Sequence, residues 1–253
     1  MKISIIQHDI VRKDLKGNLD RAEQLILSAE KSDLYVLPEM FSTGFGMKPE
    51  KIAETPDGET LQWMHRMAET TQAAIAGSVA INENGKFYNR FYFIYPDGKE
   101  IHYDKRHLFS YAKEDEHYTP GNERVVLEYK GVRILLQVCY DLRFPVFSRN
   151  CNDFDLMLYT ANWPDVRIEA WDLLLKARAV ENQCYVAAVN RCGADLSGEY
   201  EGHSVILNPF GKTLAQCTLE ENTSATLELD MEKLQQFRKD FPVLNDADDF
   251  ELK

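Results

Sequence analysis

The sequence contains few of the features that mark disulfide-bonded, zinc-binding or membrane-spanning proteins. Five of its 253 residues are cysteine, an odd number, and no two of them form a Cys-x-x-Cys pair. A disulfide framework or a zinc ribbon is therefore not indicated, and a reducing cytoplasm fits best. No apolar run is long enough to cross a membrane, and the first one stops at His8, too early for a signal peptide.

Motifs for nucleotides, metals and nucleic acids are also missing. The chain has no Gly-x-Gly-x-x-Gly or Walker loop, and no clustered histidine spacing. We therefore expect no metal and no cofactor. The 29 lysines and arginines are outnumbered by 41 acidic residues, the net charge is −12, and no basic cluster offsets it. This balance disfavours nucleic acids and anionic membranes as partners.

The sequence does contain an alternation of strands and helices. Apolar spacing predicts helices over 17–31, 59–72, 169–181 and 230–239. Strands are predicted over 2–7, 33–37, 74–81, 87–95, 101–104, 125–129, 132–138, 155–160, 185–189, 204–207, 212–214 and 225–229. No linker or repeat interrupts them, so we expect one domain over 1–253 with an acidic tail from about 240 to 253. Such a pattern is typical of an α/β sandwich with helices outside and sheet inside.

Three reactive side chains stand where predicted strands end. Glu39 lies in LPEMF, Lys105 in YDKRHLF and Cys139 in LQVCYD. A thiol needs a base to become a thiolate, a neighbouring ammonium favours that thiolate, and an attacked carbonyl needs a cation or donor to hold its oxyanion. Together these residues predict a hydrolase with a cysteine nucleophile at a sheet edge, the usual place for a site in such folds.

Each residue has an ordinary structural alternative when it is taken alone. Free cysteines are commonly buried in cores, Glu39 could be a helix N-cap or first-turn acid, and Lys105 could be a solvated loop cation. Cys139 differs from the other cysteines because a buried strand turns abruptly into a polar segment there. At such an elbow the N–H of Tyr140 can donate to a bound substrate oxyanion. His107 is the best-placed histidine, but a lone histidine is more often structural.

Taken together, the motifs resemble those of the nitrilase, or carbon–nitrogen hydrolase, superfamily. The resemblance covers about 3–229 and matches that family's catalytic triad at Glu39, Lys105 and Cys139, in the family's chain order. Further matching motifs are ANWP at 161–164, ARAVEN at 177–182 and NPFG at 208–211. The resemblance implies a four-layer α-β-β-α sandwich, usually dimerised through its outer helices, and hence a homodimer or larger homo-oligomer.

The resemblance also implies further site residues. A family glutamate six positions before a Pro-Gly corresponds to Glu114, with Glu116 as the alternative. Arg143 is expected to bind a substrate carboxylate, because a guanidinium does so bidentately. A structural ion pair with an acid such as Asp141 is its alternative. Trp163 is expected to form a wall of the substrate pocket, and simple core packing is the alternative.

The residues after the nucleophile separate branches of the superfamily. Nitrilases resemble Cys-Trp-Glu and D-amino-acid carbamoylases resemble Cys-Asn-Asp-Arg-Arg, whereas this chain reads Cys-Tyr-Asp-Leu-Arg. MFSTGF, DKRHLF and ANWP resemble the bacterial omega-amidase group. That resemblance implies release of ammonia from 2-oxoglutaramate and 2-oxosuccinamate through a thioester. The alternatives are an N-carbamoyl-amino-acid amidohydrolase or other small aliphatic amidase, a catalytically silent binding protein, and a redox sensor with Cys151 as resolving cysteine.

Overall fold

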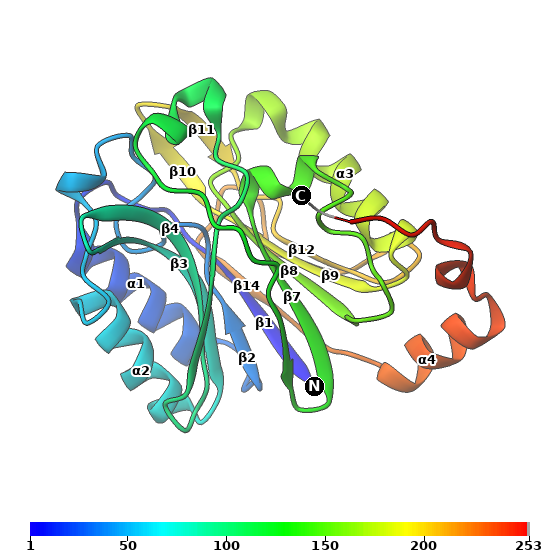
Figure 1. Cartoon of the computed structure of the whole chain (residues 1–253). Helices are drawn as coiled ribbons and strands as arrows, with labels where there is room; N and C mark the ends of the chain where they lie inside the picture. The colour runs from blue at the N-terminus through cyan, green and yellow to red at the C-terminus, as the bar shows by residue number, and fades with distance from the viewer. Residues whose placement is uncertain (252–253) are drawn as a thin grey trace.

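Two six-stranded sheets pack face to face in the computed structural model, which describes residues 1–251 (Figure 1). The first sheet has the order β14-β1-β2-β3-β4-β5, with bounds β1 (Lys2–Gln7), β2 (Leu34–Val36), β3 (Ala74–Glu83), β4 (Lys86–Ile94), β5 (Glu100–Asp104) and β14 (Thr223–Glu228). The second has the order β13-β12-β9-β8-β7-β6, with bounds β6 (Val126–Tyr129), β7 (Val132–Val138), β8 (Leu156–Ala161), β9 (Tyr185–Asn190), β12 (Val205–Leu207) and β13 (Thr213–Gln216). A separate hairpin consists of β10 (Cys192–Asp195) and β11 (Gly198–Glu201).

Helices cover the outer faces of both sheets. The first sheet carries α1 (Leu15–Ser28) and α2 (Glu59–Thr71), and the second carries α3 (Ile168–Glu181) (Figure 1). The fourth helix, α4 (Met231–Asp240), follows β14 at one end of the sandwich. Short 3₁₀ segments are Pro49–Lys51, Ser110–Ala112, Glu114–Glu116, Cys139–Arg143, Asp165–Arg167 and Val243–Asp246. Within residues 1–251, no helix is both long enough and apolar enough to cross a membrane.

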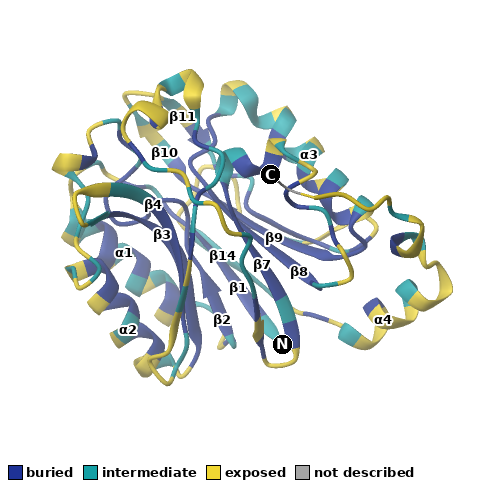
Figure 2. Cartoon of the chain, in the orientation of Figure 1, coloured by how far each residue is buried: buried dark blue, intermediate teal, exposed yellow. Residues whose placement is uncertain are grey.

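Three apolar layers hold the sandwich together. Ile5, Phe93 and Leu136 belong to the layer between the sheets, and Trp171 on α3 belongs to the layer outside the second sheet. The strands β8 and β9 are buried along their whole length, because one face meets the other sheet and the opposite face meets α3. Figure 2 shows these buried strands between helices whose outer faces are exposed. The predicted four-layer α-β-β-α sandwich is confirmed.

Strand direction gathers the polar strand ends at one edge. In the first sheet β2 is parallel to β3, β3 is antiparallel to β4, and β4 is antiparallel to β5, so β2 and β5 run the same way. Glu39 after β2 and Lys105 after β5 therefore lie at the same edge. In the second sheet β7 and β8 are parallel, so Cys139 and Asn162 follow neighbouring carboxyl ends.

The ends of the first helix differ from the prediction. The helix runs from 15 to 28, whereas apolar spacing predicted 17–31. Its start is set by Asp14, whose side chain accepts a hydrogen bond from the N–H of Gly17 at 3.1 Å. Apolar periodicity does not register such a capping contact, so it misplaced the start of the helix.

Two further segments differ from expectation. The β10–β11 hairpin was not predicted. Each of its strands has four residues, too few to show a clear alternation of apolar and polar residues, and the second begins at Gly198, which has a φ of +143°. The expected acidic tail over 240–253 packs on the sandwich in its first part, where Leu244 is buried and Gln183 donates to the carbonyl of Phe241 at 2.7 Å. Positions 252–253 of that tail lie outside the described residues.

Candidate active site

The chain turns sharply at Cys139, directly after β7. The residue has a φ of +46°, in the left-handed region that residues other than glycine seldom adopt, and it begins a 3₁₀ segment. Asp141 holds this turn, because its carboxylate accepts from the N–H of Val138 at 2.9 Å and from the hydroxyl of Tyr103 at 2.8 Å. The abrupt turn and short helix expected after the strand are therefore present.

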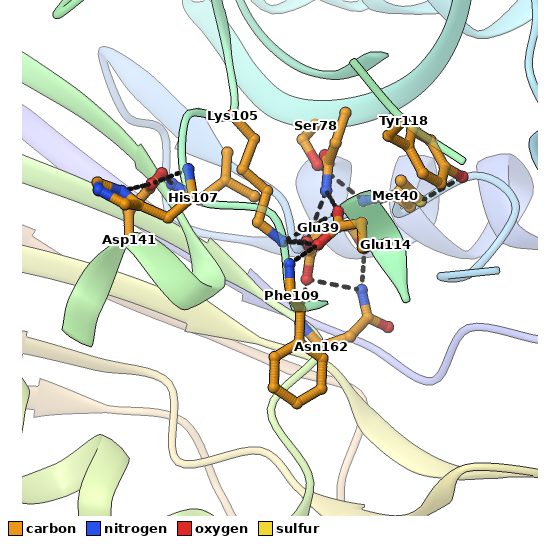
Figure 3. Close-up of polar contacts among 12 residues, drawn as sticks. Glu39, Met40, Ser78, Lys105, His107, Phe109, Glu114, Tyr118, Asp141 and Asn162 are labelled. Atoms are coloured by element: carbon orange, nitrogen blue, oxygen red, sulfur yellow. Dashed lines mark hydrogen bonds and ion pairs between the residues drawn. The ribbon is translucent and has the colours of Figure 1, made fainter. Parts of the chain in front are cut away.

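A buried ion cluster lies beside this turn (Figure 3). Lys105 Nζ lies 3.1 Å from Glu39 Oε1 and 2.9 Å from Glu114 Oε2. All three side chains are at most 1% exposed. Charges removed from water in this way are stable only when they are paired and hydrogen-bonded. The structure thus brings together two carboxylates and one ammonium that come from distant parts of the chain.

The two candidate acids of the loop have different surroundings. Glu114 is completely buried, contacts Lys105 and accepts from the N–H of Phe109 at 2.6 Å. Glu116 is exposed and lies 3.3 Å from Lys113 in an ordinary surface ion pair. The structure therefore places Glu114, and not Glu116, next to the lysine.

Two asparagines that the sequence analysis did not single out hold Glu39. Asn89 Nδ2 donates to Glu39 Oε1 at 2.7 Å and to Glu114 Oε1 at 3.3 Å. Asn162 donates through its backbone N–H to Glu39 Oε2 at 2.8 Å and through Nδ2 to the Glu39 carbonyl at 2.6 Å (Figure 3). Asn162 belongs to the recognised ANWP motif, whereas Asn89 lies inside β4 and has no local signal. These contacts fix the orientation of the carboxylate.

The balance of charge around the thiol favours its neutral form. Burial raises the pKa of Cys139 well above its ordinary value, the Glu39 charge raises it further, and Lys105 lowers it. The ammonium therefore acts in the expected direction, but burial and the two carboxylates outweigh it. Although burial disfavours its charge, Glu114 and Glu39 raise the pKa of Lys105 well above its ordinary value, so the lysine stays charged. The net direction is toward a higher pKa of the Cys139 thiol, so its ionisation needs a base.

A cavity of about 460 Å³ opens over the thiol. Cys139, Glu39 and Lys105 lie on its lining together with Tyr140 and other residues. Such a volume is in the range of small-molecule sites. Trp163 also lines the cavity while being 3% exposed, so it is both a wall of the pocket and part of the core.

Arg143 lines the cavity with its guanidinium 5.0 Å above the ring of Trp163. Asp141, its expected partner in the structural alternative, is bound instead to Tyr103 and to His107, whose Nδ1 lies 2.7 Å from the carboxylate. Within residues 1–251, Arg143 has no carboxylate partner at salt-bridge distance. Its charge is therefore available to a ligand.

Five further cations line the cavity and were not identified from the sequence. They come from separate segments and share no motif: Arg12, Lys13, Lys48, Lys51 and Arg167. The β10–β11 hairpin adds Tyr200 and the turn residue Ser197 to the lining. Only the folded chain brings these residues to the same cavity, so no local signal could have found them.

The remaining cysteines lie outside the cavity lining. Cys151 is exposed, and the other three are buried. In the described part of the chain, no group of three or more His, Cys, Asp or Glu side chains is arranged to hold a metal ion. His107 stacks on Phe144 at 3.9 Å and bonds to Asp141, which matches the structural reading of this histidine.

Comparison with known proteins agrees with this geometry. A sequence profile described as carbon-nitrogen hydrolase matches residues 2–239. The chain is 47% identical to omega-amidase YafV from Yersinia enterocolitica, covering 100% of this chain and 98% of that one. It is 35% identical to 2-oxoglutaramate amidase from Bacillus subtilis, covering 96% of each. A crystal structure of a CN-hydrolase superfamily protein from Xanthomonas campestris superposes with a TM-score of 0.96 at 41% identity, covering 100% of this chain and 99% of that one. The chain therefore belongs to the carbon–nitrogen hydrolase family.

Proposed function

We propose that the chain, acting as one hydrolase domain over 1–253, is an omega-amidase. Its substrates are the ω-amides of short 2-oxo dicarboxylic acids, namely 2-oxoglutaramate and 2-oxosuccinamate. The names of the Yersinia and Bacillus relatives support this activity. The observation that carries the proposal is a cavity that joins a thiol, a buried carboxylate and a buried ammonium to an arginine without a carboxylate partner within residues 1–251.

In the first half-reaction, Glu39 acts as general base toward Cys139. The carboxylate takes the thiol proton while sulfur bonds to the amide carbon, and the carbonyl electron pair moves to oxygen. Lys105 and the N–H of Tyr140 stabilise this oxyanion. When the tetrahedral intermediate collapses, the carbon–nitrogen bond breaks, and the nitrogen takes the proton from Glu39 and leaves as ammonia. A thioester on Cys139 remains.

In the second half-reaction, Glu39 takes a proton from water as the water oxygen bonds to the thioester carbon. The carbon–sulfur bond then breaks, and the sulfur recovers its proton from Glu39. Glu114 keeps Lys105 oriented throughout, because it accepts from the ammonium with both oxygens, at 2.9 and 3.1 Å. The three N–H bonds of the ammonium face three carboxylate oxygens, two of Glu114 and one of Glu39, so Lys105 stabilises the oxyanion chiefly through its positive charge, and the N–H of Tyr140 donates to it.

The substrate carboxylate is assigned to Arg143. Its guanidinium lies on Trp163 and lines the same cavity as the thiol. A bidentate contact with the carboxylate orients the far end of the substrate, so that the ω-amide reaches Cys139. A neutral amide lacks this contact and is expected to react less efficiently.

Two further assignments complete the proposal. We assign the protein to the cytoplasm, where thiols stay reduced, because all five cysteines are free. We also assign it to a homodimer through α3, which exposes Leu173 at 68% and Val180 at 51%. Sedimentation of the unmodified chain and of Leu173→Glu tests the dimer. A monomer in both samples contradicts this assembly and leaves the chemistry unaffected.

The test of function is a screen by ammonia release. The compounds are 2-oxoglutaramate, 2-oxosuccinamate, glutamine, asparagine, an N-carbamoyl amino acid, butyramide and a simple nitrile. We expect the highest kcat/KM for the 2-oxo ω-amides. Carbon dioxide released together with ammonia from the carbamoyl compound, at higher efficiency, would identify a carbamoyl amidohydrolase instead. Absence of turnover on every compound would favour the silent binding protein.

A further inference from the structure

The cavity lining is rich in positive charge, whereas the chain as a whole is negative. The whole sequence has 41 acidic residues against 29 lysines and arginines. Among the residues that line the cavity, seven are lysine or arginine and Glu39 is the one carboxylate. Glu39 and Lys105 are paired with each other at 3.1 Å. The buried Glu114 also pairs with Lys105, at 2.9 Å. The other six cations of the lining outnumber these two carboxylates, so the cavity carries a net positive charge in an otherwise negative protein.

Four of these cations come from two loops beside the catalytic cluster. We call Arg12, Lys13, Lys48 and Lys51 the cationic vestibule. The two loops are in contact, since a methyl group added at Gly46 would lie 3.2 Å from Arg12 Nη2. Lys13, Lys48 and Lys51 are exposed.

The vestibule is not neutralised by the protein. Within residues 1–251, none of its four cations lies within salt-bridge distance, 4.0 Å, of a carboxylate. Two acids are adjacent to these cations in sequence: Asp14 accepts from the N–H of Gly17 as the cap of α1, and Glu50, between Lys48 and Lys51, is exposed and lies beyond salt-bridge distance of both lysines. The exposed charges of the vestibule stay solvated and are not used in ion pairs with the protein, so they remain available to an anionic ligand.

We propose that the cationic vestibule captures anionic substrates and selects them over neutral amides before they reach Arg143. A cavity lined by one sign of charge concentrates ligands of the opposite sign and raises their association rate. The vestibule thus acts on entry, whereas Arg143 acts on orientation. The inference rests on the proposed function and adds a second role for the substrate's negative charge, which is capture at the cavity entrance in addition to orientation by Arg143. Its test does not require turnover.

The test compares two alkylating agents of similar size, one anionic and one neutral. Iodoacetate is an anion and iodoacetamide is neutral, and both form a carbon–sulfur bond with loss of iodide. Their rates are measured by mass spectrometry at Cys139 and at the exposed Cys151 in the same molecule. The iodoacetate-to-iodoacetamide ratio at Cys139, divided by that at Cys151, reports capture by the cavity and cancels the intrinsic reactivity of the reagents.

The variant is the double substitution Lys48→Gln and Lys51→Gln. Its matched control is Lys31→Gln with Lys99→Gln, which removes the same charge from exposed positions outside the cavity. We expect the normalised ratio to fall about 3- to 10-fold in the vestibule variant and to stay unchanged in the control. In the unmodified protein, raising salt from roughly 20 mM to roughly 500 mM should lower the ratio in the same direction, because salt screens exposed charges.

The outcomes separate the two proposals. An unchanged ratio in the vestibule variant, or an equal fall in the control, overturns the capture role even if 2-oxoglutaramate is the best substrate. A ratio that falls as expected supports capture of anions even if 2-oxoglutaramate is not hydrolysed, and in that case the proposed substrate is wrong. Salt dependence in the unmodified protein supports capture by exposed charge in the cavity, and its absence counts against capture.

Discussion

Two sets of charged side chains lie at the same cavity, and they differ in burial and in pairing. Glu39, Lys105 and Glu114 are buried, and each contacts an opposite charge at about 3 Å. The vestibule cations and Arg143 lie in the open part of the cavity and have no carboxylate partner at salt-bridge distance within residues 1–251. A buried charge without a partner costs several kcal/mol, whereas an open one remains solvated by water. Pairing is therefore required in the first set and unnecessary in the second.

This difference separates chemistry from recognition. The paired cluster is preorganised, because Asn89 and Asn162 fix the Glu39 carboxylate before any substrate arrives. The unpaired cations keep their binding capacity for a carboxylate supplied by the substrate. Substitutions in the cluster should therefore affect all amides alike, and substitutions among the open cations should affect anionic amides selectively.

The largest effect is expected at the nucleophile. Cys139→Ala should lower turnover of every amide by on the order of 10⁴-fold or more, because no other cysteine within residues 1–251 lines the cavity. Cys151→Ala is the matched control and should retain activity, as should single replacements of the three buried cysteines that leave the fold intact. Initial rates of ammonia release measure both. Persistent turnover in Cys139→Ala would show that another residue is the nucleophile. The distinction between a catalytic buried cluster around Cys139 and a substrate-binding set of open cations would then be wrong.

The next effect distinguishes the two loop acids. Glu114→Gln should lower kcat by about 10²- to 10³-fold for anionic and neutral amides alike, because Lys105 loses its second carboxylate. Glu116→Gln should change it by no more than about twofold, since a surface ion pair contributes little.

A second readout separates an electrostatic role of Glu114 from a merely structural one. The Glu114 charge raises the pKa of the Cys139 thiol, so Glu114→Gln should lower that pKa. Alkylation of Cys139 should then accelerate at lower pH than in the unmodified protein. Equal kinetic losses in Glu114→Gln and Glu116→Gln would mean that the loop, and not the buried acid, is what matters.

Arg143→Lys tests the open set. The substitution keeps the charge and loses the planar fork, and a charge-assisted contact contributes about 1.5–3 kcal/mol. We expect kcat/KM for 2-oxoglutaramate to fall about 10- to 100-fold relative to a neutral amide of similar length. If both substrates lose the same factor, Arg143 supports the fold and the carboxylate is held elsewhere. A preference of the unmodified enzyme for the neutral amide would contradict the substrate assignment itself.

The smallest effect concerns His8, a buried titratable side chain outside the cavity. Burial lowers its pKa from 6.5 to about 4, so the folded protein keeps it neutral where the unfolded chain binds a proton. The free energy of unfolding should therefore fall as the pH drops from 6.5 toward 4, with about 2 kcal/mol lost at pH 5 from this residue. Denaturant unfolding of the unmodified protein and of His8→Gln at pH 7 and pH 5 measures the difference. Equal losses in both proteins, or an NMR titration of His8 near pH 6.5, would contradict it.

The layers of the fold, and the meeting of Glu39, Lys105 and Cys139 at one cavity, could be predicted from the sequence. Apolar runs that stop at Glu39, Lys105 and Cys139 mark strand ends, and parallel strands bring such ends to one edge. The choice between Glu114 and Glu116 as the further site glutamate could not be made from the sequence, because both lie in the same acidic run. Their difference is burial, which depends on how the loop packs against β4 and β5.

The open cations could not be predicted for a related reason. Arg12, Lys48 and Arg167 are separated by long stretches of sequence and have no motif in common, so only the folded chain brings them to one cavity. The direction in which the surroundings shift the pKa of Cys139 was also beyond the sequence. One ammonium near a thiol suggests a thiolate, but the structure adds burial and two carboxylates, which reverse the sign of the net effect.

The measurement that tests the central claim most directly is the capture of the covalent intermediate. The enzyme is mixed with 2-oxoglutaramate, quenched in acid within the first turnovers, digested and examined by mass spectrometry. The account predicts a 2-oxoglutaryl thioester on the peptide that contains Cys139, formed together with ammonia and lost when hydrolysis is allowed to continue. An acyl group on another cysteine, or full turnover with Cys139 never modified, would contradict it.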